Sequence, residues 1–296
     1  MSTTAERSAE FPGGLGDGHR AGSDGAAPAD PTRVRPPART RLRAFELAAF
    51  AGVWTREVTL YKRYWASTTF SSVVEPTIYL LAFGFGFGSL VSQVAGYRYI
   101  EFVGTGVVAT AVLFVSAFAG MFVTFVRRTF QHSYDAMLAA PLDVHELVTA
   151  EAAWIATKAG GYGCAPLLVA VGFGLHPAWG MIIVPLIGFL TGFGFGLFGI
   201  WMSAIMPSID SFSYVISAVI TPVFLVAGTF FPVDRLPAWA GTAAGFNPLY
   251  HCVELVRDAA FGLEPVADLG HAGALLAFAA LMWVLAVRSM RRVLID

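Results

Sequence analysis

Six apolar stretches, each of about 18 residues or more with few charges, dominate the sequence. As a helix, such a stretch is long enough to cross the ~30 Å hydrocarbon layer of a membrane. Lipid offers the backbone no hydrogen-bond partners, so helices are the expected structure. The stretches cover residues 69–91, 103–126, 152–175, 179–205, 211–231 and 270–288. The sequence therefore predicts an all-α polytopic membrane protein with six transmembrane helices, the third and fourth forming an antiparallel hairpin.

Composition excludes several classes of protein. Of the 296 residues, 56% are hydrophobic and 13% are charged, whereas soluble domains carry about 25% charged residues. A formal net charge of −1 gives no basic surface for nucleic acid. The two cysteines, Cys164 and Cys252, are far apart and form no CxxC motif, so they are interpreted as small buried apolar residues. We therefore expect a membrane protein without nucleic-acid partners and without metal.

The chain ahead of the first apolar stretch divides into two parts. Residues 11–40 contain six Gly and five Pro, and residues 1–42 are predicted to be a disordered cytoplasmic tail. Residues 43–66 are predicted to form an amphipathic helix at the membrane interface, with cationic side chains around one apolar stripe. That stripe comprises Leu47, Phe50, Trp54, Val58, Tyr61 and Trp65. Residues 67–292 then form the six-span domain, and residues 293–296 form a cytoplasmic C-terminus.

Basic residues predict the orientation of the chain. With the N-terminus inside, fifteen Lys and Arg side chains flank the spans on the inner side and three on the outer side. The excess predicts that both termini are cytoplasmic. Inside the spans, Gly84 and Gly88 form an i, i+4 pair, as do Gly192 and Gly196. Such pairs allow close helix packing, either within the chain or across a dimer.

Several catalytic motifs are absent from the sequence. The only lysines, Lys62 and Lys158, do not follow glycine, so the chain has no phosphate loop for ATP. It also lacks HExxH and GxSxG. Ionisable residues within spans are limited to Glu75, before Pro76, and Lys158. This is a weak signal for an ion-coupled carrier, and snorkelling to the interface accounts for Glu75 equally well.

The predicted cytoplasmic loop between spans two and three contains a short helix. Residues 134–140 have a helical pattern that Pro141 ends, with Tyr134, Met137 and Leu138 available for contact. Asp143 and Glu146 have the spacing of a capping box at the start of the next helix. Two interpretations are open, a docking element for a partner protein or an interfacial loop without one.

The predicted outer loop between spans five and six has about 38 residues, too many for a plain turn. Asp234 or Asn247 is placed to cap a following helix. Prolines at three positions interrupt the loop, Pro232, Pro237 and Pro248. We expect two short re-entrant helices that dip into the outer leaflet and are buried against protein.

Three segments together resemble a known family. They are EPTIYLLAFGFGFG from Glu75, YDAMLAAPLDVHELVTAEAAWIATKA from Tyr134 and ITPVFLVAGTFFPVDRLPAW from Ile220. In this order, over residues 45–290, they resemble the permease subunits of type-2 ABC exporters. The likeness is closest to nodulation lipo-oligosaccharide exporter permeases, and daunorubicin-type drug-export permeases share a weaker outline.

The resemblance implies a half-transporter in a bacterial inner membrane. Two copies of this permease would work with two copies of a separate ABC ATPase, which would hold ATP and Mg. No catalytic, cofactor-binding or metal residue is then expected in this chain. The resemblance assigns the coupling helix to Tyr134, Asp135, Ala136, Met137 and Leu138. It assigns the translocation path to Glu75, Pro76, Pro222 and Phe231. The outer re-entrant region expected from the loop itself comprises Pro232, Asp234, Pro237, Asn247 and Pro248.

Four functional hypotheses follow. The first is export of an amphipathic lipid-linked saccharide or similar lipid-like molecule, contacted by some of the 25 Phe side chains. The second is efflux of a hydrophobic drug through the same architecture. The third is an ion-coupled secondary transporter, and an assembly subunit that conducts no substrate ranks below it. The choice of cargo depends on analogy, because one scaffold can carry several functions.

Overall fold

The computed structural model describes residues 46–91, 93–235 and 237–295. The five longest helices are α1 (Leu47–Gly86), α2 (Tyr99–Phe118), α5 (Val144–Gly172), α6 (Val184–Ile205) and α11 (Pro265–Leu294). The shorter helices are α3 (Thr124–Thr129), α4 (Ser133–Leu138), α7 (Phe212–Val215), α8 (Thr221–Leu225), α9 (Ala238–Gly245) and α10 (Pro248–Phe261). Strands β1 (Gln93–Val94) and β2 (Tyr97–Arg98) form an antiparallel ribbon between α1 and α2.

Single turns of other helix types join several of these elements. π-Helical turns at Ala119–Val123 and Ile216–Ile220 continue α2 into α3 and α7 into α8. Short 3₁₀ turns occur at Phe87–Ser89, Trp179–Ile183, Ile209–Ser211 and Val233–Arg235. The helical path of the chain therefore continues through α2 and α3 and through α7 and α8 without a loop.

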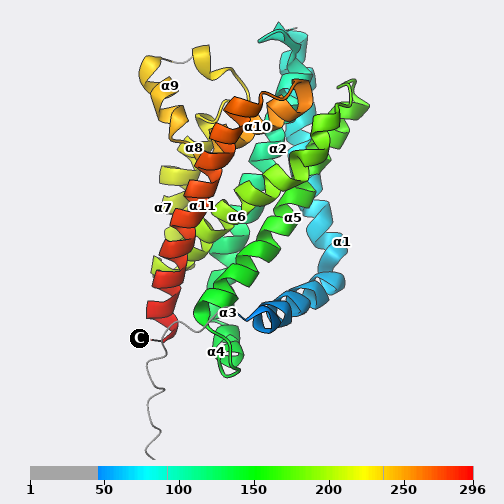
Figure 1. Ribbon diagram of the computed structural model, residues 1–296. Coiled ribbons are helices and arrows are strands. Elements are labelled where there is room, and N and C mark those ends of the chain that lie inside the picture. The colour runs from blue at the N-terminus through cyan, green and yellow to red at the C-terminus, as the bar shows by residue number, and fades with distance from the viewer. Residues whose placement is uncertain (1–45, 92, 236, 296) are drawn as a thin grey trace, which may run out of the picture. The chain divides into compact units, whose positions relative to one another are not determined.

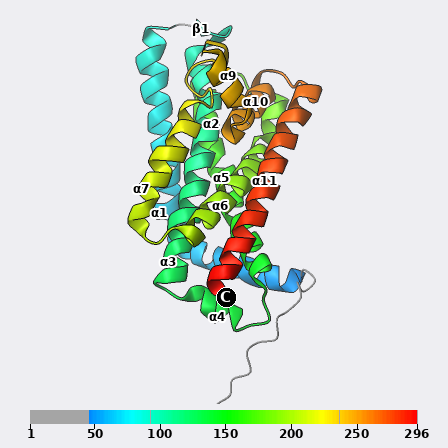
Figure 2. The same cartoon turned by 90° about the vertical axis from the view of Figure 1, so that its left-hand side faces the viewer.

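α2 and α6 form the centre of the bundle (Figure 1). α6 packs against α2, α5 and α11, and most side chains of α2 and α6 are buried. Figure 2 shows α2, α5 and α6 between α1 and α7 on one side and α11 on the other. The outer helices bury only one stripe each, which in α11 is Leu275, Ala279, Met282, Ala286 and Met290. This stripe has the three- and four-residue spacing of a helix that packs along one face.

Four helical segments of the described residues are long and apolar enough to cross a membrane. They are Leu47–Ser89, Tyr99–Thr129, Trp179–Ile205 and Pro265–Leu294. Ile209–Leu225 is apolar but shorter, and α5 is long but carries Glu146, Glu151 and Lys158. The predicted helical membrane architecture is therefore present, including the α5 and α6 pair. The total of six spans and the re-entrant helices stay predictions.

α1 differs from the prediction in its continuity. The sequence predicted an interfacial helix over residues 43–66 and a separate span from residue 69, but one helix runs from Leu47 to Gly86. Figure 1 shows this helix changing direction between a segment that lies across the lower end of the bundle and one that runs along it. The predicted tail, residues 1–42, and residues 43–45 lie outside the described residues.

The glycines of α6 allow close packing within the chain. A Cβ atom added to Gly199 would lie 2.5 Å from the Ala117 carbonyl oxygen and 2.8 Å from the Gly120 Cα. One added to Gly192 would lie 2.7 Å from the Ala159 Cβ. Because these neighbours belong to the same chain, at least these glycines of α6 serve intramolecular contact between helices rather than a dimer contact.

We predict that Gly199→Ala lowers the melting temperature of the detergent-solubilised protein, because the added methyl group must displace backbone atoms. The expected loss is about 1–3 kcal/mol. Gly161→Ala is the matched control, since a Cβ atom at Gly161 meets nothing within 4 Å, and this variant should be neutral or slightly stabilised. Equal melting temperatures for Gly199→Ala and the wild type would contradict the packing argument.

Candidate functional site

The sequence GTFFP after α8 forms a tight turn whose shape follows from its residues. Gly228 has φ +79°, a conformation that favours glycine. Arg257 on α10 donates a hydrogen bond of 2.6 Å to the Gly228 carbonyl oxygen, and its guanidinium lies 3.8 Å from the centroid of the Phe102 ring. Thr229 is buried next to Gly106 of α2, where a side chain larger than hydrogen would clash. The turn is therefore held between α2 and α10.

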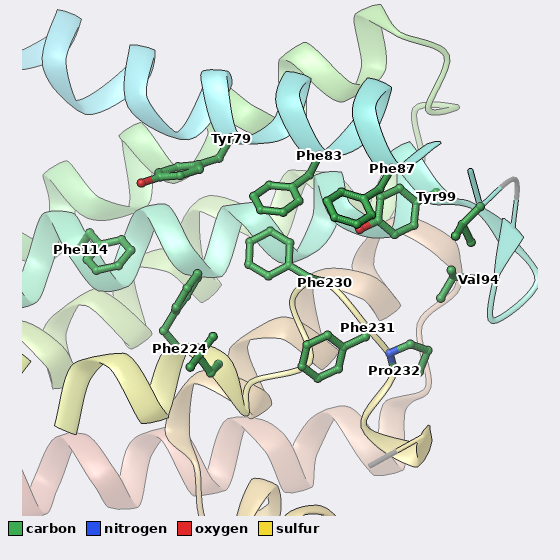
Figure 3. Close-up of a pocket in the computed structure, with 12 residues that line it drawn as sticks. Tyr79, Phe83, Phe87, Val94, Tyr99, Phe114, Phe224, Phe230, Phe231 and Pro232 are labelled. Atoms are coloured by element: carbon green, nitrogen blue, oxygen red, sulfur yellow. The ribbon is translucent and has the colours of Figure 1, made fainter. Parts of the chain in front are cut away.

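The two phenylalanines of this turn line an aromatic cavity of about 590 Å³ (Figure 3). Phe230 faces Phe83 of α1 with ring centroids 4.5 Å apart, and it lies 5.6 Å from Phe224. The opposite wall comes from α1 and α2. The aromatic and proline residues that line the cavity are Tyr79, Phe83, Phe87, Tyr99, Phe114, Phe224, Phe230, Phe231 and Pro232.

The aromatic cavity is suited to an apolar ligand. Its side-chain polar groups are the hydroxyls of Tyr79 and Tyr99, and the other lining side chains are aromatic rings, aliphatic groups and a proline. Tyr79, Phe87 and Phe231 are each more than a third exposed, so the cavity is open. Aromatic side chains bind apolar groups over large areas with few specific polar contacts. A lipid tail or a planar apolar molecule has this chemistry.

A second cavity of about 470 Å³ adjoins the aromatic cavity, because Tyr79 and Phe114 line both. Its lining is more polar and includes Glu75, Lys158 and Tyr162. The structure thus divides the predicted path residues between two adjoining cavities. Glu75 and Pro76 line the second cavity, Phe231 lines the aromatic cavity, and Pro222 is exposed on α8 and lines neither.

The predicted coupling helix is present as α4, Ser133–Leu138, and its role stays a prediction. Asp135 and Ala136 are exposed, and Met137 and Leu138 are half-buried. Met137 also lines a cavity of about 380 Å³ that α1 and residues 140–142 complete. The prediction that Tyr134 is available for contact is wrong, because this residue is only 1% exposed.

Tyr134 points into a buried polar cluster formed by four elements. Its hydroxyl donates a hydrogen bond of 2.5 Å to a Glu151 carboxylate oxygen on α5. Arg127 of α3 lies 3.0 Å from Glu151, and its two Nη atoms lie 2.8 and 2.9 Å from the two carboxylate oxygens of Glu57 on α1. Thr124 donates to Glu151 at 3.1 Å. The cluster therefore joins α4 to α1, α3 and α5.

Burial gives Arg127 and Tyr134 defined roles in this cluster. Glu57 and Glu151 are each 3% exposed, so their charges need a partner to offset lost hydration. Arg127 supplies that partner in a bidentate geometry. Burial, together with the neighbouring Glu151 carboxylate, raises the pKa of Tyr134 well above its usual value. The phenol therefore stays protonated and acts as a hydrogen-bond donor.

Glu57 and Glu151 were not predicted from the sequence to be members of a site. One signal was present, because Glu57 follows Phe50, Val53 and Trp54 at helical spacing, on the face that packs inward. An acid on an apolar face predicts a buried partner of opposite charge. The partner itself lies 70 residues away, which local spacing does not reveal.

The predicted capping residues are partly confirmed. The Asn247 side chain accepts a hydrogen bond from the Leu249 N–H at 2.9 Å and caps α10, with Pro248 at its first position. Glu146 accepts one from the Asp143 N–H at 3.0 Å at the start of α5. Pro232 lines the aromatic cavity, and Pro237 precedes α9. Asp234 lies in the Val233–Arg235 turn, and its side chain lies outside the described part.

Known proteins resemble the chain over most of its length. The ABC-2 type transporter family matches residues 48–261. Nodulation protein J of Rhizobium leguminosarum bv. trifolii is 35% identical over 81% of this chain and 92% of its own length. Nodulation protein J of Rhizobium meliloti (strain 1021) is 32% identical over 81% and 92%. The inner membrane transport permease YadH of Escherichia coli (strain K12) is 22% identical over 78% and 90%.

The matched residues include the features described above. The family match begins at the start of α1 and ends with α10, so it contains both cavities, α4 and the buried polar cluster. The resemblance inferred from the three sequence segments is therefore confirmed. The chain belongs to the ABC-2 type transporter family, and its helices are those of a transport permease.

Proposed function

We propose that this chain is the membrane permease of an ATP-driven exporter that moves an amphipathic, lipid-linked saccharide or similar lipid-like molecule out of the cytoplasm. The observation that carries the proposal is the pair of adjoining cavities, one aromatic and one partly polar. An amphiphile has an apolar and a polar part joined in the same way. The resemblance of the three sequence segments to nodulation lipo-oligosaccharide exporter permeases supports a lipid-like cargo, and the similarity to proteins named Nodulation protein J extends over 81% of the chain.

The proposed assembly contains two copies of the permease and two copies of a separate ABC ATPase, which holds ATP and Mg. In this arrangement the exposed face of α4 contacts the ATPase, and the exposed apolar faces of α1 and α7 contact membrane lipids or the second permease. Tyr64, Trp65, Phe70, Ile78 and Tyr214 supply much of that apolar surface. Exposed apolar side chains in this number favour lipid or protein contact over water.

We further propose six membrane crossings with both termini in the cytoplasm of a bacterial cell. Besides the four long apolar segments, α5 and the Ile209–Leu225 region would cross. The 29 residues of α5 exceed the ~20 that a crossing helix needs. Its buried carboxylates, Glu146 and Glu151, accept hydrogen bonds from protein groups and do not face lipid. α9 and α10 would lie in the outer leaflet, and the excess of inner Lys and Arg supports the orientation.

Within this proposal the buried polar cluster transmits movement. A displacement of α4 by the ATPase would act on Tyr134 and, through Glu151 and Arg127, on Glu57 of α1. α1 also carries Glu75 of the second cavity, Phe83 of the aromatic cavity and Tyr79, which lines both. The path from α4 to Glu57 therefore consists of short, charge-assisted contacts, which hold a more defined geometry than apolar packing. From Glu57 the α1 helix itself continues to the cavities.

Co-purification tests the proposed function. We expect the tagged permease, isolated from its host in mild detergent, to carry a phosphate-loop ATPase at similar abundance, identified by mass spectrometry, and the complex to hydrolyse ATP. Vesicles that contain the complex should move the cargo only with ATP. Transport by the permease alone, driven by an ion gradient, would instead support a secondary transporter.

The exposed acid of α4 provides a test of coupling. We predict that Asp135→Lys lowers ATP-dependent transport by about tenfold or more, because it reverses a charge at the ATPase contact. Membrane insertion should be unchanged, since the side chain lies outside the bundle. Asp210→Lys is the matched control, an exposed acid in another short helical turn. Equal transport by both variants would remove α4 from the ATPase contact.

The aromatic cavity provides a separate test. We predict that Phe230→Ala weakens binding of an acyl-chain amphiphile by about tenfold, since the variant loses an aromatic contact worth 1–3 kcal/mol. Phe246→Ala is the matched control, because Phe246 is exposed and lines neither cavity. Binding can be measured by native mass spectrometry. A planar drug that binds tightly while acyl chains do not would favour the hydrophobic drug efflux alternative.

A further inference from the structure

The chain contains two lysines, and they have different environments. Lys62 is exposed on α1, close to the predicted interface. Lys158 lies within α5, two turns beyond Glu151, and lines the second cavity. Among the described residues that line this cavity, Lys158 carries the positive charge and Glu75 carries the negative charge. The two groups do not form an ion pair.

Within the described part of the chain, the Lys158 ammonium has no hydrogen bond and no ion pair. Its close neighbour is the Trp154 ring, whose centroid lies 6.0 Å from Nζ. The carboxylates whose charges act on Lys158 at longer range, Glu57 and Glu151, are already bound by Arg127. A cation in an apolar helix is costly unless an anion or a polar group contacts it. Lys158 therefore has capacity for a ligand.

Hydroxyl groups accompany Lys158 in the cavity. Tyr162 follows it by one turn on α5, and its hydroxyl lies 3.1 Å from the Thr69 hydroxyl and 3.0 Å from the Tyr61 hydroxyl. Thr110 of α2 lines the same space. The Tyr162 hydroxyl already donates to Tyr61 and the Thr110 hydroxyl to the Gly106 carbonyl, so the Lys158 ammonium is the charged donor that matches phosphate, sulfate or carboxylate oxygens. Glu75 is placed to accept hydrogen bonds from a sugar hydroxyl of the same ligand.

We propose that the second cavity binds the anionic headgroup of the transported amphiphile, with Lys158 as the counter-ion of a phosphate, sulfate or carboxylate. The apolar tail then occupies the aromatic cavity, which Tyr79 and Phe114 connect to the headgroup cavity. This inference rests on the proposed function and adds the charge of the cargo to it. Neutral lipids and neutral drugs are excluded as preferred cargo.

Two probes with the same acyl chain test the headgroup. They are 1-oleoylglycerol 3-phosphate and neutral 1-oleoylglycerol, each titrated into the assembled complex in a neutral detergent and followed by native mass spectrometry. We expect the wild type to bind the phosphate probe about tenfold more tightly, the effect of one charge-assisted contact. Lys158→Gln should lose this preference and bind the neutral probe as the wild type does, and Lys158→Arg should retain it.

Lys62→Gln is the matched control, since it removes the other lysine, and it should bind both probes as the wild type does. A preference retained by Lys158→Gln, or lost equally in Lys62→Gln, would overturn the assignment of Lys158. Equal binding of both probes by the wild type would overturn the headgroup inference alone, whereas binding of neither would overturn the proposed amphiphile export as well. Addition of ATP should release the phosphate probe, and retention through the ATP cycle would mark it as a structural lipid rather than cargo.

Discussion

The packing of α1, α3 and α5 against one another depends on the two ion pairs of Arg127. Its guanidinium contacts both Glu57 and Glu151, and all three side chains are largely removed from water. Loss of one partner from such a group typically costs 3–5 kcal/mol, because it leaves an uncompensated buried charge. The geometry also fixes register, since both oxygens of Glu57 are bound. The placement of α1 and α5 relative to α3 is thereby defined.

The same helix, α1, carries Glu57 of this cluster and, further along, a row of residues that line the two cavities. Glu75, Tyr79, Phe83 and Phe87 recur at intervals of four residues and line the second cavity at one end and the aromatic cavity at the other. Residues at this spacing lie along one face of a helix. The face therefore changes from a carboxylate through a phenol to phenyl rings. A gradient of this kind matches the polarity of a molecule with a charged head and an apolar tail.

Local sequence signals predicted the elements more fully than the contacts between them. The capping roles of Asn247 and Glu146, the helix at α4 and the α5 and α6 pair follow from short-range patterns, and each is present. Hydrophobic stripes also placed α1, but they suggested two helices, because tertiary packing rather than periodicity decides whether a helix continues. The breadth of the family match agrees with the motif resemblance.

The polar cluster shows why the contacts between helices could not be predicted from the sequence. The position of Tyr134 on a short loop helix predicted a residue exposed for contact with a partner. Its hydroxyl instead donates a hydrogen bond to the carboxylate of Glu151, 17 residues away. Likewise, Arg127 was counted as a flanking charge for orientation, although its partner Glu57 precedes it by 70 residues. Long-range pairing of this kind depends on which helix faces meet, and a single sequence gives their periodicity without their partners.

Pro76 gives the continuous helix α1 one point of lower resistance to bending. Proline has no backbone N–H, so the bond that residue 76 would donate to the Ser72 carbonyl is missing from the helix. Ser72, Glu75 and Pro76 all line the second cavity, so this turn of α1 lies beside the proposed headgroup site. A force applied at Glu57 must cross this turn before it reaches Phe83 and Phe87. In the proposed exporter, movement at α4 would therefore act first on the headgroup and then on the tail.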